Sequence, residues 1–163
     1  MSIWEESADI VFKNGIIFNP FTCEWLKEDF AVKSGIVIGT GFGYQGKKEI
    51  DLKSSYIVPG FIDAHVHIES SLLTPYEYAR LVMQHGTTTV IADPHEIANV
   101  WGIKGIEYML QAHEDQPLDI LVMLPSCVPA TPIDECAMTL NADLLRPFIG
   151  RNGVLGLGEM MNV

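Results

Sequence analysis

The chain has 163 residues, of which 48% are hydrophobic and 19% charged, so it is long enough to bury a globular core. It carries 10 Lys and Arg residues against 21 Asp and Glu residues, and the formal net charge of −11 argues against a protein that binds the phosphate backbone of a nucleic acid. No apolar segment approaches the length that spans a membrane, so no membrane partner is expected.

The first six residues and the cysteines bear on the cellular compartment. Residues 1–6 contain neither a basic flank nor an apolar run, so we expect no signal peptide. The three cysteines, Cys23, Cys127 and Cys136, are odd in number and lack Cys-x-x-Cys spacing, which is typical of reduced thiols. Both observations predict a cytoplasmic protein.

Short β-strands separated by glycine-bearing turns are predicted for the first 57 residues. Segments 9–12 and 16–18 flank Asn14-Gly15, a pair typical of a hairpin turn. Segments 30–32 and 36–38 repeat the strand-turn-strand pattern around Lys-Ser-Gly. This pattern predicts a small N-terminal β-sandwich lobe.

The next predicted strand carries two histidines at alternate positions. A Pro-Gly turn and an apolar pair precede Asp63, His65 and His67. Because side chains alternate along a strand, these three are expected on one face, with Cα atoms about 6–7 Å apart at each step. Both imidazoles then reach one metal ion, and Asp63 suits a position behind them. Two merely solvated histidines are the alternative, but a partly buried strand must provide partners for such groups.

Strands alternate with helices after Glu69. Thr74 and the proline after it predict a helix start, and the helix is expected to stop at Gly86. The further predicted elements are a strand at 87–92, a helix at 102–114, a strand at 119–124, a short helix at 141–148 and a strand at 153–158. This alternation predicts an α/β fold with a parallel sheet, and the four strands make half of a (β/α)8 TIM-type barrel, which takes about 250 residues.

Polar side chains follow the ends of all four barrel strands. Barrel enzymes place their working groups there, and buried polar groups need partners. The polar clusters are His65/His67/Glu69, Asp93/His95/Glu96, Ser126 and Glu159. His85 and His113 fall on predicted helices and are interpreted as solvated or packed side chains.

Several runs of sequence resemble one enzyme family. Residues 58–67, Val-Pro-Gly-Phe-Ile-Asp-Ala-His-Val-His, resemble the opening motif of the amidohydrolase superfamily, whose barrels carry His-x-His at the end of the first strand. Residues 67–71, 92–100 and 158–162 resemble the adenine deaminase family. The similarity runs from about Asp9 to the last residue. It implies that residues 1–57 form half of a composite β-sandwich domain, and that residues 58–163 form the first half of the barrel.

The resemblance also implies roles for the residues at the strand ends. His65 and His67 would bind the more buried of two divalent ions, and Glu159 would bridge both ions where many amidohydrolases use a carboxylated lysine. His95 either supports a metal ligand, contacts the substrate or is itself an additional metal ligand, and with Glu159 it is a candidate catalytic residue. The predicted purine contacts are Glu69, Ser70 and Glu96.

The implied reaction is metal-dependent hydrolytic deamination of adenine to hypoxanthine and ammonia, as in purine salvage. Imidazole and carboxylate ligands suit Mn²⁺, Fe²⁺ or Zn²⁺, and the resemblance favours Mn²⁺ or Fe²⁺ in a binuclear centre. The general acid and the remaining ligands, two histidines and an aspartate, are expected on later strands. The 163-residue chain alone is therefore expected to be inactive, and the full-length protein is expected to be a homo-oligomer.

Three alternative functions compete with adenine deamination. A cyclic-amide hydrolase such as a dihydroorotase or hydantoinase shares the superfamily but usually carries lysine where Glu159 stands. A non-catalytic fragment or scaffold would keep the fold without turnover. A nucleic-acid deaminase of the His/Cys/Cys zinc type is excluded, because the chain lacks Pro-Cys-x-x-Cys.

Overall fold

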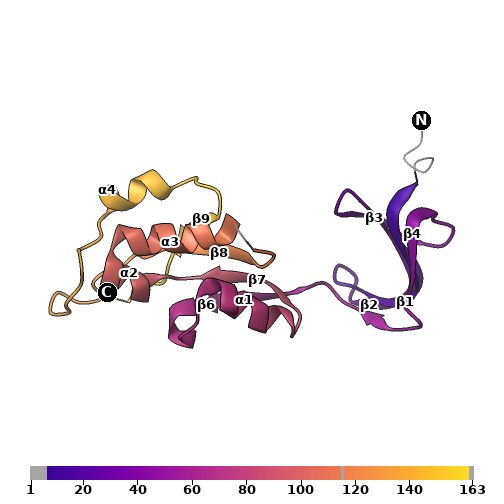
Figure 1. The fold of residues 1–163 in the computed structure, drawn as a ribbon, viewed down its shortest axis with the longest axis horizontal. Coiled ribbons are helices and arrows are strands. Elements are labelled where there is room, and N and C mark those ends of the chain that lie inside the picture. The colour runs from indigo at the N-terminus through magenta and orange to yellow at the C-terminus, as the bar shows by residue number, and fades with distance from the viewer. Residues whose placement is uncertain (1–6, 115, 162–163) are drawn as a thin grey trace. The chain divides into compact units, whose positions relative to one another are not determined.

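The computed structural model describes residues 7–114 and 116–161 (Figure 1). Residues 1–6, which carry the expectation about a signal peptide, and Asn162, in the motif after the fourth strand, lie outside the described residues. The chain divides into two compact units, Met1–Pro59 and Gly60–Val163.

The N-terminal unit is built on one five-stranded β-sheet. Its strands are β1 (Ala8–Asn19), β2 (Glu24–Lys33), β3 (Ile36–Gly41), β4 (Gly46–Asp51) and β5 (Tyr56–Ile57). The sheet order is β3-β2-β1-β4, and β5 also pairs with β1. Ala8, Val11 and Ala31 form a small buried core beside Tyr44. The predicted strand-rich unit is present, and its place in a sandwich stays a prediction.

The Asn-Gly pair does not form the hairpin turn that its sequence predicts. Asn14 lies inside β1 with φ of 58°, and the pairing of β1 with β2 shifts register between Phe12 and Gly15. The backbone N–H of Asn14 donates to Asp29 Oδ1 at 2.9 Å. The pair therefore forms a β-bulge, and the hairpin turn comes after Asn19, because the apolar pattern continues across the bulge on both strands.

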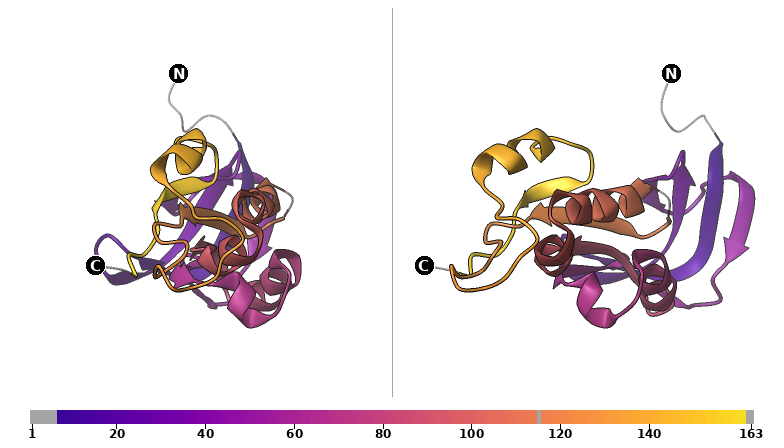
Figure 2. Two further views of the ribbon diagram at one scale, coloured as in Figure 1. Left: turned by 90° about the vertical axis from the view of Figure 1, so that its left-hand side faces the viewer. Right: turned by 60° about the vertical axis from the view of Figure 1, so that its left-hand side comes forward.

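The C-terminal unit is a mixed α/β structure with a parallel sheet, as predicted. The sheet order is β6-β7-β8-β9, formed by β6 (Phe61–Val66), β7 (Thr87–Ala92), β8 (Asp119–Leu124) and β9 (Val154–Leu157). The intervening helices are η1 (Ile68–Ser71), α1 (Pro75–Met83), α2 (His95–Trp101), α3 (Ile103–Glu114), α4 (Ala142–Leu145) and η2 (Arg146–Phe148). Figure 2 shows the same alternation of strands and helices from two further sides.

The two helices α1 and α2 are capped differently, one by a residue adjacent in sequence and the other by a distant residue. Thr74 Oγ1 accepts the N–H of Glu77 at 3.3 Å, which confirms the predicted start of α1. Helix α2 was not predicted, because its N-cap residue Pro94 provides no side-chain hydrogen bond. Instead, the cap comes from Glu69, which lies 28 residues before Ile97 in the sequence. Its Oε1 accepts the N–H of Ile97, in the first turn of α2, at 3.1 Å.

The core of this unit lies between the sheet and its helices. Val90, Ala92, Ile120 and Val122 from the two central strands are fully buried there. Helices α1 and α3 pack against these strands and contact each other. The alternate side chains of the same strands, such as Ile91, are only half-buried. One face of the sheet is therefore packed more tightly than the other.

Replacing Ile106 with alanine is expected to lower the free energy of unfolding by about 2–5 kcal/mol, because the substitution leaves a cavity in a close-packed core. Ile106 lies on α3 and is fully buried. Gln111→Ala, an exposed position on the same helix, is the matched control and is expected to change stability by at most about 0.5 kcal/mol. Urea unfolding measures both, and equal losses would contradict this description of the core.

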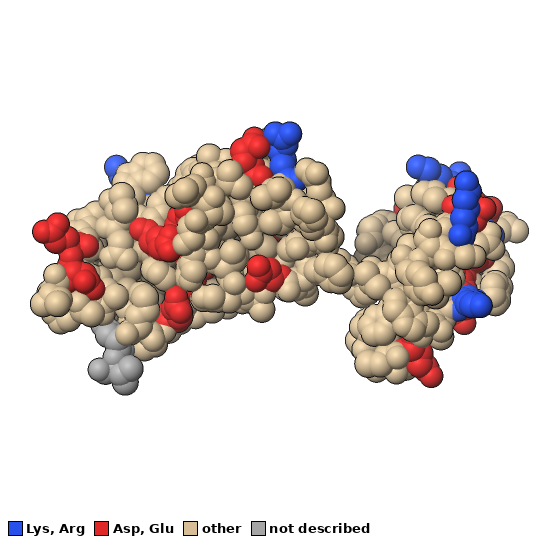
Figure 3. Space-filling view, turned by 90° about the horizontal axis from the view of Figure 1, so that it is seen from below, with Lys and Arg blue, Asp and Glu red and all other residues tan. Residues whose placement is uncertain are grey.

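Charge is unevenly divided along the chain. Residues 60–163 contain 4 Lys and Arg residues against 13 Asp and Glu residues. Among the described residues on the face drawn in Figure 3, the basic side chains of this unit form no continuous patch. None of the helices in the described part of the chain is long and apolar enough to cross a membrane.

Candidate metal centre

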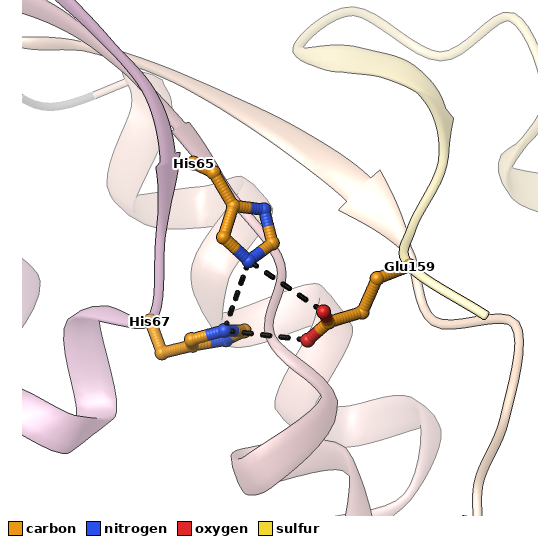
Figure 4. Close-up of side chains that lie close together, drawn as sticks. All are labelled: His65, His67 and Glu159. Atoms are coloured by element: carbon orange, nitrogen blue, oxygen red, sulfur yellow. Dashed lines mark hydrogen bonds and ion pairs between the residues drawn. The ribbon is translucent and has the colours of Figure 1, made fainter. Parts of the chain in front are cut away.

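The candidate residues meet at one edge of the parallel sheet. His65 lies in β6 and His67 follows it, Asp93 and His95 follow β7, and Glu159 follows β9. Parallel strands end at the same edge, so groups distant in sequence come together there. Figure 4 shows the side chains of His65, His67 and Glu159 pointing toward one another.

The geometry of the His-x-His pair fits a single metal ion. His65 Nε2 and His67 Nε2 are 3.1 Å apart, and the rings are nearly perpendicular at 85°. Two imidazole nitrogens that each lie about 2.1 Å from one ion, with an angle of about 90–110° between the bonds, are about 3.0–3.4 Å apart. The Glu159 carboxylate oxygens lie 3.8 Å from His65 Nε2 and 3.4 Å from His67 Nε2. The three donors therefore face a common point.

The ring of His67 is oriented by its second nitrogen. Its Nδ1 lies 2.8 Å from the backbone carbonyl oxygen of Asp93. A carbonyl only accepts hydrogen bonds, so Nδ1 is the donor, and in the neutral imidazole Nε2 is then the nitrogen with the lone pair. Metal-binding histidines are commonly oriented by such a bond to a carbonyl or carboxylate.

Asp63 lies at an irregularity in strand β6. Strand β6 ends at Val66, and its pairing with β7 shifts register between Asp63 and Val66. Asp63 Oδ1 accepts the backbone N–H of His65 at 3.2 Å. Burial and, secondarily, the negative charge of Asp63 raise the pKa of Tyr78 on α1. The strand is therefore distorted between Asp63 and Val66 as it reaches the site. His65 and His67 still bring their Nε2 atoms within 3.1 Å of each other, and the place of Asp63 on the same face stays a prediction.

His95, the first residue of α2, lies beside the carboxylate of Glu159. Its Nδ1 is 3.4 Å from Asp93 Oδ1 and 3.5 Å from Glu159 Oε1. Both His95 Nδ1 and Asp93 Oδ1 are buried without a hydrogen-bond partner. Asp93, His95 and Glu159 each offer a donor atom within 4.8 Å of the others. Buried polar atoms without partners are costly, so the chemistry of this donor set fits a second cation.

The three predicted purine contacts lie on η1 and α2. Glu69 Oε1 caps α2, and its other oxygen is buried without a hydrogen-bond partner. Burial, aided by the charge of Glu96, raises the pKa of Glu69. Ser70 Oγ donates to Glu96 Oε1. The structure brings these residues together, and their contact with a purine stays a prediction.

The sequence predicts only that Ser126 and Asp93 follow strand ends, and it assigns no specific contact to either side chain. Both bind the backbone of Glu159: the Ser126 hydroxyl donates to its carbonyl oxygen, and Asp93 Oδ2 accepts its N–H at 2.8 Å. Only the strand-end position signals these contacts in the sequence. His85 and His113 belong to none of the His/Cys/Asp/Glu clusters found among the described residues.

Comparison with known proteins places the chain in a family. An adenine deaminase from Methanoregula boonei is 61% identical over 158 residues, which cover 97% of this chain and 28% of the relative. An adenine deaminase from Methanoculleus marisnigri is 66% identical over 135 residues, covering 83% of this chain and 26% of the relative. The chain thus spans little more than a quarter of these curated relatives.

Solved structures support the same fold at lower sequence identity. A β-aspartyl dipeptidase from Fervidobacterium islandicum AW-1 superposes with a TM-score of 0.56 at 19% identity, covering 96% of this chain and 42% of that chain. The family model described as "Amidohydrolase family" matches residues 56–160, which include both histidines of the His-x-His pair and Glu159. The chain belongs to the amidohydrolase family.

Proposed function

We propose that this chain supplies the first part of an adenine deaminase, which hydrolyses adenine to hypoxanthine and ammonia in purine metabolism. The convergence of His65, His67 and Glu159 on one point carries the proposal. Identity of 61% and 66% to relatives named adenine deaminases supports the choice of substrate. The chain spans 28% or less of those relatives, so the activity is proposed for the intact protein that contains it.

The parallel sheet is proposed to be the first half of a (β/α)8 barrel that occupies residues 58–163. Edge-strand side chains support this proposal, since Ile62 on β6 is 65% exposed and Leu155 on β9 is 53% exposed. Further strands pairing with β6 and β9 would bury them, as barrel closure requires. The sheet of residues 1–57 is proposed to be half of a β-sandwich domain.

The donor set is proposed to hold two divalent ions, Mn²⁺ or Fe²⁺, with Zn²⁺ also compatible. His65 and His67 would hold one ion, Glu159 would contact both, and His95 with Asp93 faces the position of the other. Such ions lower the pKa of water toward neutrality and polarise the group under attack. The protein's part is to hold these donors in place at the sheet edge before substrate enters.

The chain's own residues would bind and orient the purine. Ser70 holds the carboxylate of Glu96 beside the site, so Glu96 is placed to accept a hydrogen bond from a ring N–H. Glu69, on η1, supports the position of Glu96 because its carboxylate caps the first turn of α2, the helix that carries Glu96. His95 Nδ1, which faces two carboxylates, is placed to hold a proton during the reaction or to bind the second ion. The intact protein is proposed to be a cytoplasmic homo-oligomer.

The test measures two reactions of the intact protein after loading with Mn²⁺: ammonia release from adenine, and ring opening of dihydroorotate and hydantoin, which releases no ammonia. We expect turnover of adenine and no turnover of dihydroorotate or hydantoin, because Glu159 stands where cyclic-amide hydrolases usually carry lysine. Turnover of a cyclic amide without adenine would replace the proposal with the cyclic-amide reaction. Stoichiometric metal binding without turnover of any of the three would favour a non-catalytic scaffold.

A further inference from the structure

The backbone of Glu159 is held from both sides by two neighbouring strands. Its N–H donates to Asp93 Oδ2 at 2.8 Å, and its carbonyl oxygen accepts from the Ser126 hydroxyl. Asp93 follows β7 and Ser126 follows β8, so the residue after β9 is bound to the ends of both preceding strands. The carboxylate of Glu159 is 40% exposed, and it projects from a backbone that is fixed at its N–H and its carbonyl.

Asp93 also fixes the histidine on the other side of the site. Its backbone N–H donates to the carbonyl oxygen of Val66 at 3.0 Å, and its own carbonyl accepts from His67 Nδ1 at 2.8 Å. The Asp93 residue is 1% exposed, so its bonds lie in a region with little competing water. One buried residue therefore sets both the ring of His67 and the backbone of Glu159.

Gly158 provides the room that this arrangement needs. A Cβ atom at Gly158 would overlap the carboxylate of Asp93. The N–H of Gly158 also donates to the carbonyl of Leu124 at 2.7 Å, which ties the segment to the end of β8. The absence of a side chain here is thus a requirement of the close approach between the Asp93 carboxylate and the Glu159 backbone.

We propose that Asp93 and Ser126 are positioning residues that clamp the Glu159 backbone and so set where its carboxylate meets the metal ions. This inference rests on the proposed function, because it requires that Glu159 binds metal. Hydrogen-bond partners that orient a ligand typically change metal affinity by about 10- to 100-fold when removed. The clamp predicts an effect of that size when the hydroxyl of Ser126 is removed, because this hydroxyl bonds the carbonyl oxygen of Glu159 and is not among the proposed metal ligands.

The test compares four variants of the intact protein with the parent. Ser126→Ala removes the donor to the Glu159 carbonyl, and Ser126→Thr keeps a hydroxyl. Gly158→Ala displaces the Asp93 carboxylate. Thr131→Val is the matched control, because Thr131 loses a hydroxyl that bonds Asp134 within its own loop. Each metal-free protein is titrated with Mn²⁺ while the electron paramagnetic resonance signal of the free ion is recorded, and its thermal unfolding is measured without metal.

We expect Ser126→Ala and Gly158→Ala to weaken Mn²⁺ binding by about 10- to 100-fold, and Ser126→Thr to restore it to within about threefold of the parent. The metal-free Ser126→Ala protein should unfold at the parent's temperature. A Ser126→Ala protein that binds Mn²⁺ within twofold of the parent would overturn the clamp. A Thr131→Val protein that loses as much Mn²⁺ affinity as Ser126→Ala would also overturn it. A parent that binds Mn²⁺ but releases no ammonia from adenine would refute the proposed function and leave the clamp standing.

Discussion

Replacing Glu159 with glutamine is expected to remove at least one metal ion from the intact protein and to lower kcat/KM for adenine by about 10³-fold or more, since the metal supplies several kcal/mol. Glutamine keeps the length of the side chain and the backbone bonds to Asp93 and Ser126. What is lost is the negative charge that faces His65, His67 and His95. The loss therefore reports on the carboxylate itself.

The measurements for Glu159→Gln are metal content by elemental analysis and ammonia release from adenine. Glu107→Gln is the matched control, because Glu107 is exposed on α3 and belongs to none of the described clusters. The control should retain the parent's metal content and activity. Full metal content with full activity in Glu159→Gln would remove this residue from the site.

Replacing His67 with alanine is expected to weaken Mn²⁺ binding by more than the roughly 100-fold that is typical of losing a residue that only orients a ligand. Two functions end together: the Nε2 lone pair facing Glu159 disappears, and the carbonyl of Asp93 loses its donor. His85→Ala, an exposed histidine after α1, is the matched control and should bind Mn²⁺ as the parent does.

The Mn²⁺ titration described for the clamp measures both histidine variants. A His67→Ala protein that binds within threefold of the parent would show that the ion is held without the His-x-His pair. An equal loss of Mn²⁺ affinity in His85→Ala would show that the protein is generally destabilised and that the loss in His67→Ala is not due to a missing ligand. Thermal unfolding of the metal-free proteins separates these two explanations.

The regular part of the fold follows closely from local sequence patterns. The strands at 87–92 and 119–124 are found at the predicted bounds, because β-branched and apolar residues make up most of each strand. The start of α1 was predicted because Thr74 caps it from the adjacent residue. Local signals suffice where the stabilising partner is a neighbour in sequence.

The differences arise where the partner is distant. Helix α2 depends on a cap from Glu69, and the sequence near its own start gives no such signal. The bulge at Asn14 depends on Asp29 in the neighbouring strand, so a pair that favours a hairpin in isolation is absorbed into β1. Tertiary contacts outweigh the local preference at both positions.

The same distinction applies to the metal centre. Spacing alone predicted that His65 and His67 reach one ion, and their nitrogens are placed accordingly. Spacing along the chain contains no information on the backbone bonds from Asp93 and Ser126 to Glu159, since these residues are 66 and 33 positions away from it. Only the assembled sheet edge brings them into contact.

The most direct measurement is an anomalous difference map from a crystal of the intact protein grown with Mn²⁺, recorded near the manganese absorption edge. We expect a peak about 2.0–2.3 Å from both His65 Nε2 and His67 Nε2, with a carboxylate oxygen of Glu159 at a similar distance. Manganese bound elsewhere, with these three side chains contacting only water, would contradict it.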